Sequence, residues 1–120
     1  MARPTCADEK LMRALQDSFD ATTRLTLNMK KTGQEIVASD NSSPTITQMM
    51  QTGMGLCAEL VEPIGKIEQL LMRPMRLVIR SEAVDALQCA AIPFQKLQKF
   101  SQEMTMLKKF NDKHSGVDVH

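Results

Sequence analysis

The chain has 120 residues, of which 42% are hydrophobic and 24% are charged, and its formal net charge is +1. This length suits a single domain, and the composition is that of a folded protein and not of a disordered one. The chain has ten methionines but only four phenylalanines and no tyrosine or tryptophan, which argues against a strand-rich fold or a nucleic-acid stacking platform. The near-neutral net charge gives the whole molecule no electrostatic preference for nucleic acid or an anionic membrane.

The first predicted helix begins near Cys6. Thr5 is followed three residues later by Asp8, which resembles a capping box with acidic residues in the first turn. Apolar residues then recur at steps of three or four, although several threonines dilute this face. Gly33 would cost about 1 kcal/mol relative to alanine inside a helix, so the helix is expected to end near it or to fray towards Ser39.

A polar boundary precedes the most regular stretch of the chain. The segment ASDNSS leads into Pro44, a pattern typical of a linker with Ser43 as N-cap and proline in the first helical turn. From Pro44 to Leu71, apolar residues recur at helical spacing with almost no charge. This stretch is predicted to be the central helix, covered by other helices on several sides.

The prolines repeat with a spacing of thirty residues. A shift of thirty places Pro44 on Pro74 and Pro63 on Pro93. Two similar halves of this kind predict an antiparallel hairpin, in which each arm is a helix with an internal proline kink.

The second arm of this hairpin is expected to begin at Pro74 or at Ser81. Residues 77–79 have the composition of a strand, but no second strand is available to pair with them, so they are predicted to be helical. Lysines near the far end suit a helix C-terminus, which is expected near Asn111. The predicted domains are an N-terminal helical arm over residues 1–40, a helical hairpin over 41–112 and a mobile tail over 113–120.

The predicted fold is all-α: an antiparallel hairpin of proline-kinked helices plus an N-terminal helix. It closes either as a three-helix bundle or as an open hairpin completed by a partner. Small residues on the central helix allow a second backbone to come close, and they are expected to face alanines of the third helix. The small residues are Gly53, Gly55, Ala58 and Gly65, and the alanines are Ala83, Ala86, Ala90 and Ala91.

No catalytic site is predicted, because periodicity places neither a nucleophile beside a base nor two carboxylates on one face. Cys6, Cys57 and Cys89 form no CxxC motif, and their odd count argues against a disulfide framework or a zinc site. Cys57 and Cys89 are expected to be small buried hydrophobes. His114 and His120 fall in the predicted tail, which offers a metal no rigid support. The protein is therefore expected to be a non-enzyme without metal or cofactor.

Compartment and membrane contact are predicted from absences in the sequence. Free cysteines suit a reducing cytoplasm. No apolar run approaches the ~20 residues that span a bilayer, and the N-terminal residues lack the apolar core of a signal peptide. The chain is expected to remain in the cytoplasm.

Arg73, Arg76 and Arg80 have the spacing that stacks guanidinium groups on one helical face. Such a face is able to contact nucleic-acid phosphates or, with residues 77–79 inserted, an anionic membrane surface. The arginines are few and no aromatic residues are interleaved, so a solvated face is favoured. Binding of nucleic acid or membrane remains the alternative function.

The favoured function follows from the methionines of the central helix. Met49, Met50 and Met54 are adaptable side chains of the kind that line grooves for helices of other proteins. The protein is therefore expected to bury a Met-rich helical face against amphipathic helices of a partner, or against a second copy. By size and composition it has the general character of a small chaperone or adaptor of a bacterial secretion system. The predicted partner-binding residues are Ile46, Met49, Met50, Met54, Leu56, Leu60, Ile64, Ile67, Leu87, Phe94 and Leu97.

Overall fold

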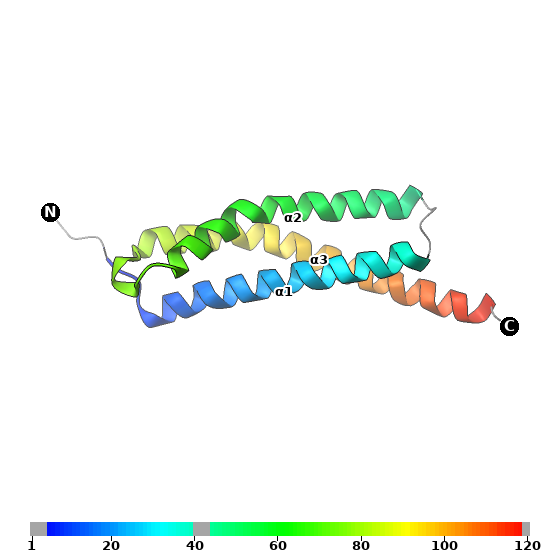
Figure 1. Ribbon diagram of the computed structural model, residues 1–120, viewed down its shortest axis with the longest axis horizontal. Coiled ribbons are helices and arrows are strands. Elements are labelled where there is room, and N and C mark those ends of the chain that lie inside the picture. The colour runs from blue at the N-terminus through cyan, green and yellow to red at the C-terminus, as the bar shows by residue number, and fades with distance from the viewer. Residues whose placement is uncertain (1–4, 40–43, 119–120) are drawn as a thin grey trace.

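The protein is a long bundle of helices (Figure 1). The computed structural model describes residues 5–39 and 44–118, without the side chains of Ser39 and of residues 111–118. Within these residues lie α1 (Glu9–Ser39), α2 (Pro44–Leu71), a short 3-10 helix η1 (Met75–Leu77) and α3 (Arg80–Asp118). The bundle is 74 Å long and 22 Å wide. The all-α prediction is confirmed.

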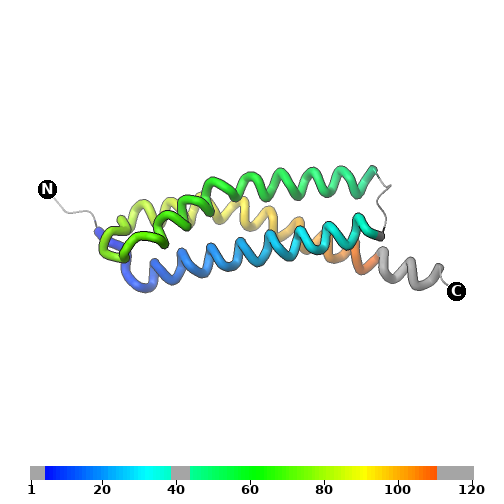
Figure 2. The backbone as a smooth tube through the Cα atoms, in the orientation of Figure 1, coloured from blue at the N-terminus to red at the C-terminus, as the bar shows by residue number. Residues whose placement is uncertain are grey.

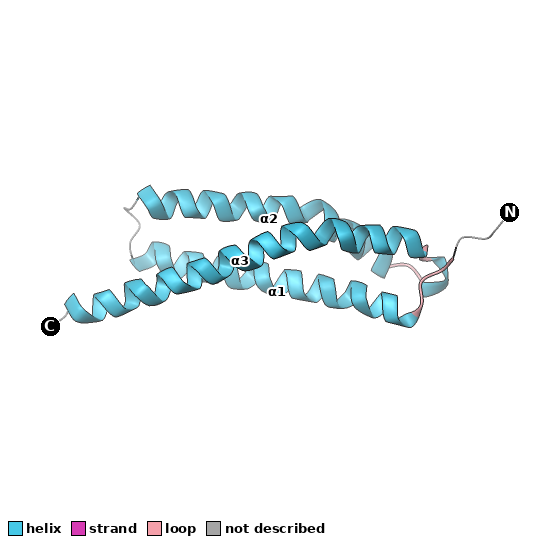
Figure 3. Ribbon diagram, turned by 180° about the vertical axis from the view of Figure 1, so that it is seen from behind, coloured by secondary structure: helices cyan, strands magenta, loops and turns pink. Residues whose placement is uncertain are grey.

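The three helices alternate in direction. α1 and α3 run the same way along the bundle, and α2 runs against both (Figures 1 and 3). Each helix packs against the other two, so the hairpin of α2 and α3 is closed by α1. Of the two predicted arrangements, the three-helix bundle is therefore the one observed.

Each helix buries one stripe of residues spaced seven apart. Such a repeat keeps the same face towards the neighbouring helices when they cross at small angles, as in coiled coils. The buried stripes are Leu15, Thr22, Met29 and Ile36 in α1, Ile46, Gly53, Leu60 and Ile67 in α2, and Ala83, Ala90, Leu97 and Met104 in α3.

The core consists of two clusters that follow one another along the bundle. The first cluster contains Leu15, Ile67 and the buried alanines of α3, and the second contains Leu97 and Met104 with other large side chains. Ile64 packs against both, so it marks the level at which they meet. Below, these groups are called the first cluster and the second cluster.

Two of the helices carry an internal proline near the level where the clusters meet. In α2, Pro63 precedes Ile64, and in α3, Pro93 lies between Ala90 of the first cluster and Phe94 of the second. A proline inside a helix leaves the carbonyl four residues earlier without its usual N–H partner. Pro63 and Pro93 line one surface pocket, and the α2 backbone changes direction near its middle (Figure 2). α1 has no internal proline, and its buried Thr22 lies between Leu15 of the first cluster and Met29 of the second.

The Thr22 hydroxyl leads to a stability prediction. This side chain is 3% exposed, and its Oγ1 has no hydrogen-bond partner among the described residues. A buried hydroxyl without a partner costs about 1–3 kcal/mol, so Thr22→Val, which keeps the shape, should raise the free energy of unfolding by about 1 kcal/mol. Thr26→Val is the matched control because the Thr26 hydroxyl donates to backbone carbonyls of Thr22 and Thr23 at 3.0 and 2.9 Å. Urea unfolding in which Thr22→Val is the less stable of the two variants would contradict this account.

The residues before α1 pair with the connection between α2 and α3. Cys6 and Ile79 form an isolated antiparallel bridge. Two backbone hydrogen bonds of 2.8 Å flank it, one from Ala7 to Val78 and one from Arg80 to Thr5. The prediction of helix over residues 77–79 is therefore wrong for Val78 and Ile79, whereas Leu77 ends η1. The extended residues Val78 and Ile79 do have a pairing partner, which is the segment Thr5–Ala7 near the N-terminus.

The helix ends match the predictions only in part. α2 has the predicted bounds, Pro44–Leu71, whereas Ser43 lies outside the described residues. α1 begins at Glu9, because Asp8 caps it by accepting a hydrogen bond of 2.8 Å from the Leu11 N–H. α1 continues through Gly33, which is buried against Met50: a Cβ added there would lie 2.8 Å from the Met50 methyl.

α3 departs from the prediction mainly at its C-terminal end. Of the two predicted starts, Pro74 and Ser81, the second is within one residue of the observed start at Arg80, because η1 and the bridge at Ile79 precede α3. The helix continues to Asp118 instead of ending near Asn111, so much of the predicted tail is helical. Extending an existing helix fixes the backbone of only one residue for each hydrogen bond gained, so even residues without apolar contacts continue the helix readily.

The predicted pairing of glycines with alanines is wrong. Because α2 and α3 are antiparallel, Gly53 faces Phe100 and Met29. Ala83, Ala86 and Ala90 instead pack in the first cluster with Ile67 and Leu70, whereas Ala58 and Ala91 are exposed. A Cβ added at Gly55 or Gly65 would meet nothing within 4 Å.

Two ion pairs join α1 or its N-cap to α3. Arg80 Nη1 lies 3.7 Å from the Asp8 carboxylate, and Lys108 pairs with Glu35. The hydrogen bond from Lys108 lowers the pKa of the Glu35 carboxyl. This pair therefore stabilises the fold at neutral pH, and its contribution is lost as the pH falls through the titration of Glu35.

Candidate protein-binding groove

An apolar groove of about 550 Å³ lies between α1 and α2, over the second cluster. We call it the α1–α2 groove. α1 contributes Thr26, Leu27, Met29, Lys30 and Gln34, α2 contributes Met49, Met50, Gly53, Met54, Cys57, Ala58 and Val61, and α3 contributes Phe100 and Met104.

Three large apolar side chains of the groove are exposed to solvent. Leu27 is 63% exposed, Met54 69% and Val61 71%. Single exposed apolar residues are ordinary on protein surfaces, but a group of them around one groove is typical of a binding surface. Leu27 stands on α1, and the other two stand on α2, so both walls of the groove expose apolar side chains.

The predicted partner-binding residues divide into core and surface. Ile46, Leu60, Ile67 and Leu97 are buried within the chain, so the fold leaves them unavailable to a partner. A second group is half-buried against the two clusters: Met49, Met50, Leu56, Ile64, Leu87 and Phe94. Of the eleven predicted partner-binding residues, only Met54 is exposed. The structure brings three of the eleven together in the α1–α2 groove, namely Met49, Met50 and Met54.

The α1 side of the groove was missed by sequence reasoning. Leu27 and Lys30 lie outside the buried stripe of α1, which passes through Thr22 and Met29. A leucine off the buried face of an amphipathic helix is the signal that would have pointed to this wall. Val61 gives the same signal on α2, because it follows the buried Leu60 directly.

The predicted arginine face does not form. Arg73 lies in the turn after α2, Arg76 in η1 and Arg80 at the first residue of α3, so no single helix presents all three. Arg73 pairs with Glu82 at 3.3 Å, and Arg80 pairs with Asp8, which precedes α1. Within the described residues, Arg76 forms no ion pair.

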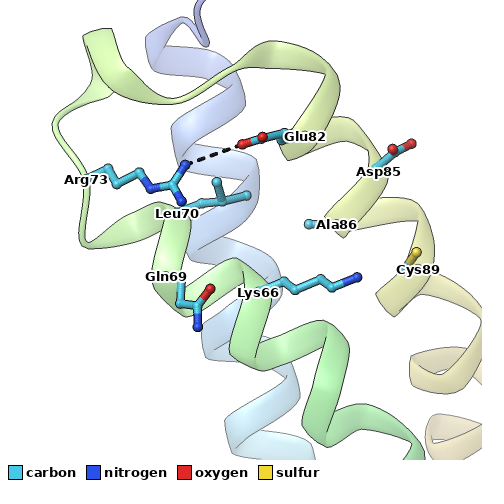
Figure 4. Close-up of a pocket in the computed structure, with 8 residues that line it drawn as sticks. All are labelled: Lys66, Gln69, Leu70, Arg73, Glu82, Asp85, Ala86 and Cys89. Atoms are coloured by element: carbon cyan, nitrogen blue, oxygen red, sulfur yellow. Dashed lines mark hydrogen bonds and ion pairs between the residues drawn. The ribbon is translucent and has the colours of Figure 1, made fainter.

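A second, more polar pocket of about 350 Å³ lies between the end of α2 and the start of α3 (Figure 4). The Arg73 guanidinium and the Glu82 carboxylate point toward one another across it (Figure 4). Lys66 and Asp85 add one charge of each sign. Because the charges are mixed and two neutralise each other, the pocket concentrates no charge for a ligand. Across the part of the chain that the structure describes, no three His, Cys, Asp or Glu side chains gather as a metal site requires.

The three cysteines occupy different surroundings. Cys89 is exposed, so the prediction that it is buried is wrong. The Cys6 thiol is also exposed and donates a hydrogen bond of 3.0 Å to the Arg76 carbonyl. Cys57 is half-buried in the α1–α2 groove, and burial raises the pKa of its thiol.

These surroundings predict the order of thiol reactivity. The thiolate is the reactive form, so Cys57 in the folded protein should react several-fold more slowly with a thiol reagent than Cys89. Single-cysteine variants labelled at pH 7.5, with and without urea, measure this difference, which should disappear on unfolding. Faster labelling of Cys57 in the folded state would show that the groove does not shield it.

Comparison with protein families, with curated proteins and with solved structures finds no match to this chain. None of the described helices combines the length and apolar character that crossing a membrane requires. His120 and the side chain of His114 lie outside the described parts of the structure.

Proposed function

We propose that this protein is a non-enzymatic helical module that binds an amphipathic helix of another protein in the α1–α2 groove. One observation carries the proposal: five of the ten methionines line this groove, together with the exposed Leu27 and Val61. Methionine side chains are flexible and polarizable, so they adjust to different apolar side chains of a bound helix. Helix-in-groove recognition uses this kind of surface.

The two ends of the bundle are built differently, which supports this assignment. The first cluster packs small alanines closely, and the bridge between Cys6 and Ile79 closes that end. The second cluster carries the groove. One end of the bundle is thus closed by backbone pairing, whereas the other carries an apolar groove. Covering Leu27, Met54 and Val61 would contribute roughly 1–2 kcal/mol each to binding.

Within this proposal, the chain acts as a small chaperone or adaptor subunit in the cytoplasm, as in a bacterial secretion system. Occupation of the groove stabilises both chains by mass action, because the ligand binds the folded state. A second copy of the chain presents helices too, so self-association is the other outcome that the groove permits.

A synthetic amphipathic peptide with a leucine stripe at helical spacing tests the proposal. Met54→Glu places a charge inside the groove and should weaken binding of this peptide more than tenfold. Met72→Glu is the matched control, because Met72 is 79% exposed but lies after α2 and outside the groove. Fluorescence anisotropy measures both affinities, and circular dichroism confirms that both variants fold. Equal effects of the two substitutions, or no saturable binding to the wild type, would contradict the proposal.

A second candidate function is contact with an anionic surface through the connection between α2 and α3. Met72, Met75 and Leu77 are 79%, 41% and 57% exposed there, beside Arg76. Apolar side chains flanked by cations suit a membrane interface or nucleic-acid phosphates. Co-sedimentation with anionic vesicles and titration with generic DNA, each repeated at rising salt, test this candidate. Binding that does not weaken with salt would exclude it.

A further inference from the structure

Among the residues that the structure describes, Lys30 is the only charged one that lines the α1–α2 groove. It is exposed, and no carboxylate pairs with it among the described residues. Leu27 and Gln34 stand about one helical turn to either side of it on α1. The opposite wall, which includes Met54, Ala58 and Val61, contributes no charge. The groove is therefore mainly apolar, with Thr26 and Gln34 as neutral polar residues and one positive charge on its α1 wall.

We infer that the occupant of this groove is an amphipathic helix with an acidic residue beside its apolar stripe, on the side that faces α1. This inference rests on the proposed function. A bound helix excludes water from the groove, which strengthens the attraction between Lys30 and a carboxylate and equally strengthens repulsion of a cation. In the complex we expect the aliphatic part of this side chain to pack on the bound helix while its ammonium group stays at the rim.

The position of Lys30 also fixes how the partner helix is rotated. Because the α2 wall is uncharged, an acidic residue gains a partner only when it lies on the α1 side. The apolar contacts hold the helix in the groove, and this single charge selects among helices with the same apolar stripe.

Two synthetic peptides with one leucine stripe test the inference. One carries glutamates beside the stripe and the other carries lysines at the same positions. At low salt, the wild type should bind the glutamate peptide about three- to tenfold more tightly, and Lys30→Glu should reverse this preference. Lys99→Glu is the control, because it changes the net charge equally and Lys99 is an exposed residue of α3 outside the groove lining. The preference should disappear towards 1 M salt.

The outcomes separate the inference from the proposed function. If both peptides bind the wild type equally and Lys30→Glu changes neither affinity, the groove binds helices without selecting charge, and the inference is overturned. The inference is also overturned if Lys99→Glu reverses the preference, because the net charge of the protein then determines which peptide binds more tightly. If neither peptide binds, the proposed function itself fails.

Discussion

Leu97→Ala should lower the free energy of unfolding by about 2–5 kcal/mol. Leu97 is completely buried in the second cluster, so its removal takes away apolar contacts and leaves a cavity. Single domains have a total stability of about 5–15 kcal/mol, so this loss should shift the urea unfolding midpoint strongly.

Ile92→Ala is the control for this substitution. Ile92 stands on the same helix and is 63% exposed, so its replacement should change stability by no more than about 0.5 kcal/mol. The comparison also separates a core role of Leu97 from the partner-binding role that the sequence predicted. A Leu97→Ala protein as stable as the wild type would contradict the observed packing.

Gly53→Ala should be destabilising although alanine is the better helix former. A Cβ added at Gly53 would lie 2.9 Å from Cε1 of Phe100 and 3.3 Å from the Met29 methyl. The Phe100 ring is 8% exposed and packed in the second cluster, so it has little room to move. The strain should outweigh the gain in helix propensity, and the free energy of unfolding should fall by about 1–2 kcal/mol.

Gly55→Ala should have the opposite sign. A Cβ added there would meet nothing within 4 Å, so only the propensity gain of up to about 1 kcal/mol remains. The two variants lie two residues apart on α2 and have the same composition. Urea unfolding in which both move in the same direction would show that Gly53 does not hold α2 close to Phe100.

The central helix shows how much local sequence determines. Pro44 favours the first helical turn, and the long apolar periodicity that follows has one interpretation, so the bounds of α2 were predictable. Pairings between segments that are distant in the sequence were not predictable. Thr5–Ala7 is too short to give a strand signal, and nothing in it indicates Val78 as a partner.

Which residues of neighbouring helices lie opposite one another could not be predicted from the sequence either. The sequence shows that Gly53 is small, but only the antiparallel offset of α2 and α3 shows that Phe100 stands opposite. Only one wall of the groove was predicted. Met50 and Met54 were recognised within α2, whereas the α1 wall was signalled only by Leu27 lying off the buried face, and the packing of α1 beside α2 places Leu27 and Lys30 in the groove.

The methionines themselves provide the most direct test of the α1–α2 groove. In protein labelled with ¹³C at the methionine methyl groups, titration with the leucine-stripe peptide should shift the signals of Met50 and Met54 in a saturable way. Met72, Met75 and Met106 are exposed but lie outside the groove, so their signals should stay in place. Shifts confined to these three, with Met50 and Met54 unmoved, would contradict the claim that the groove binds helices.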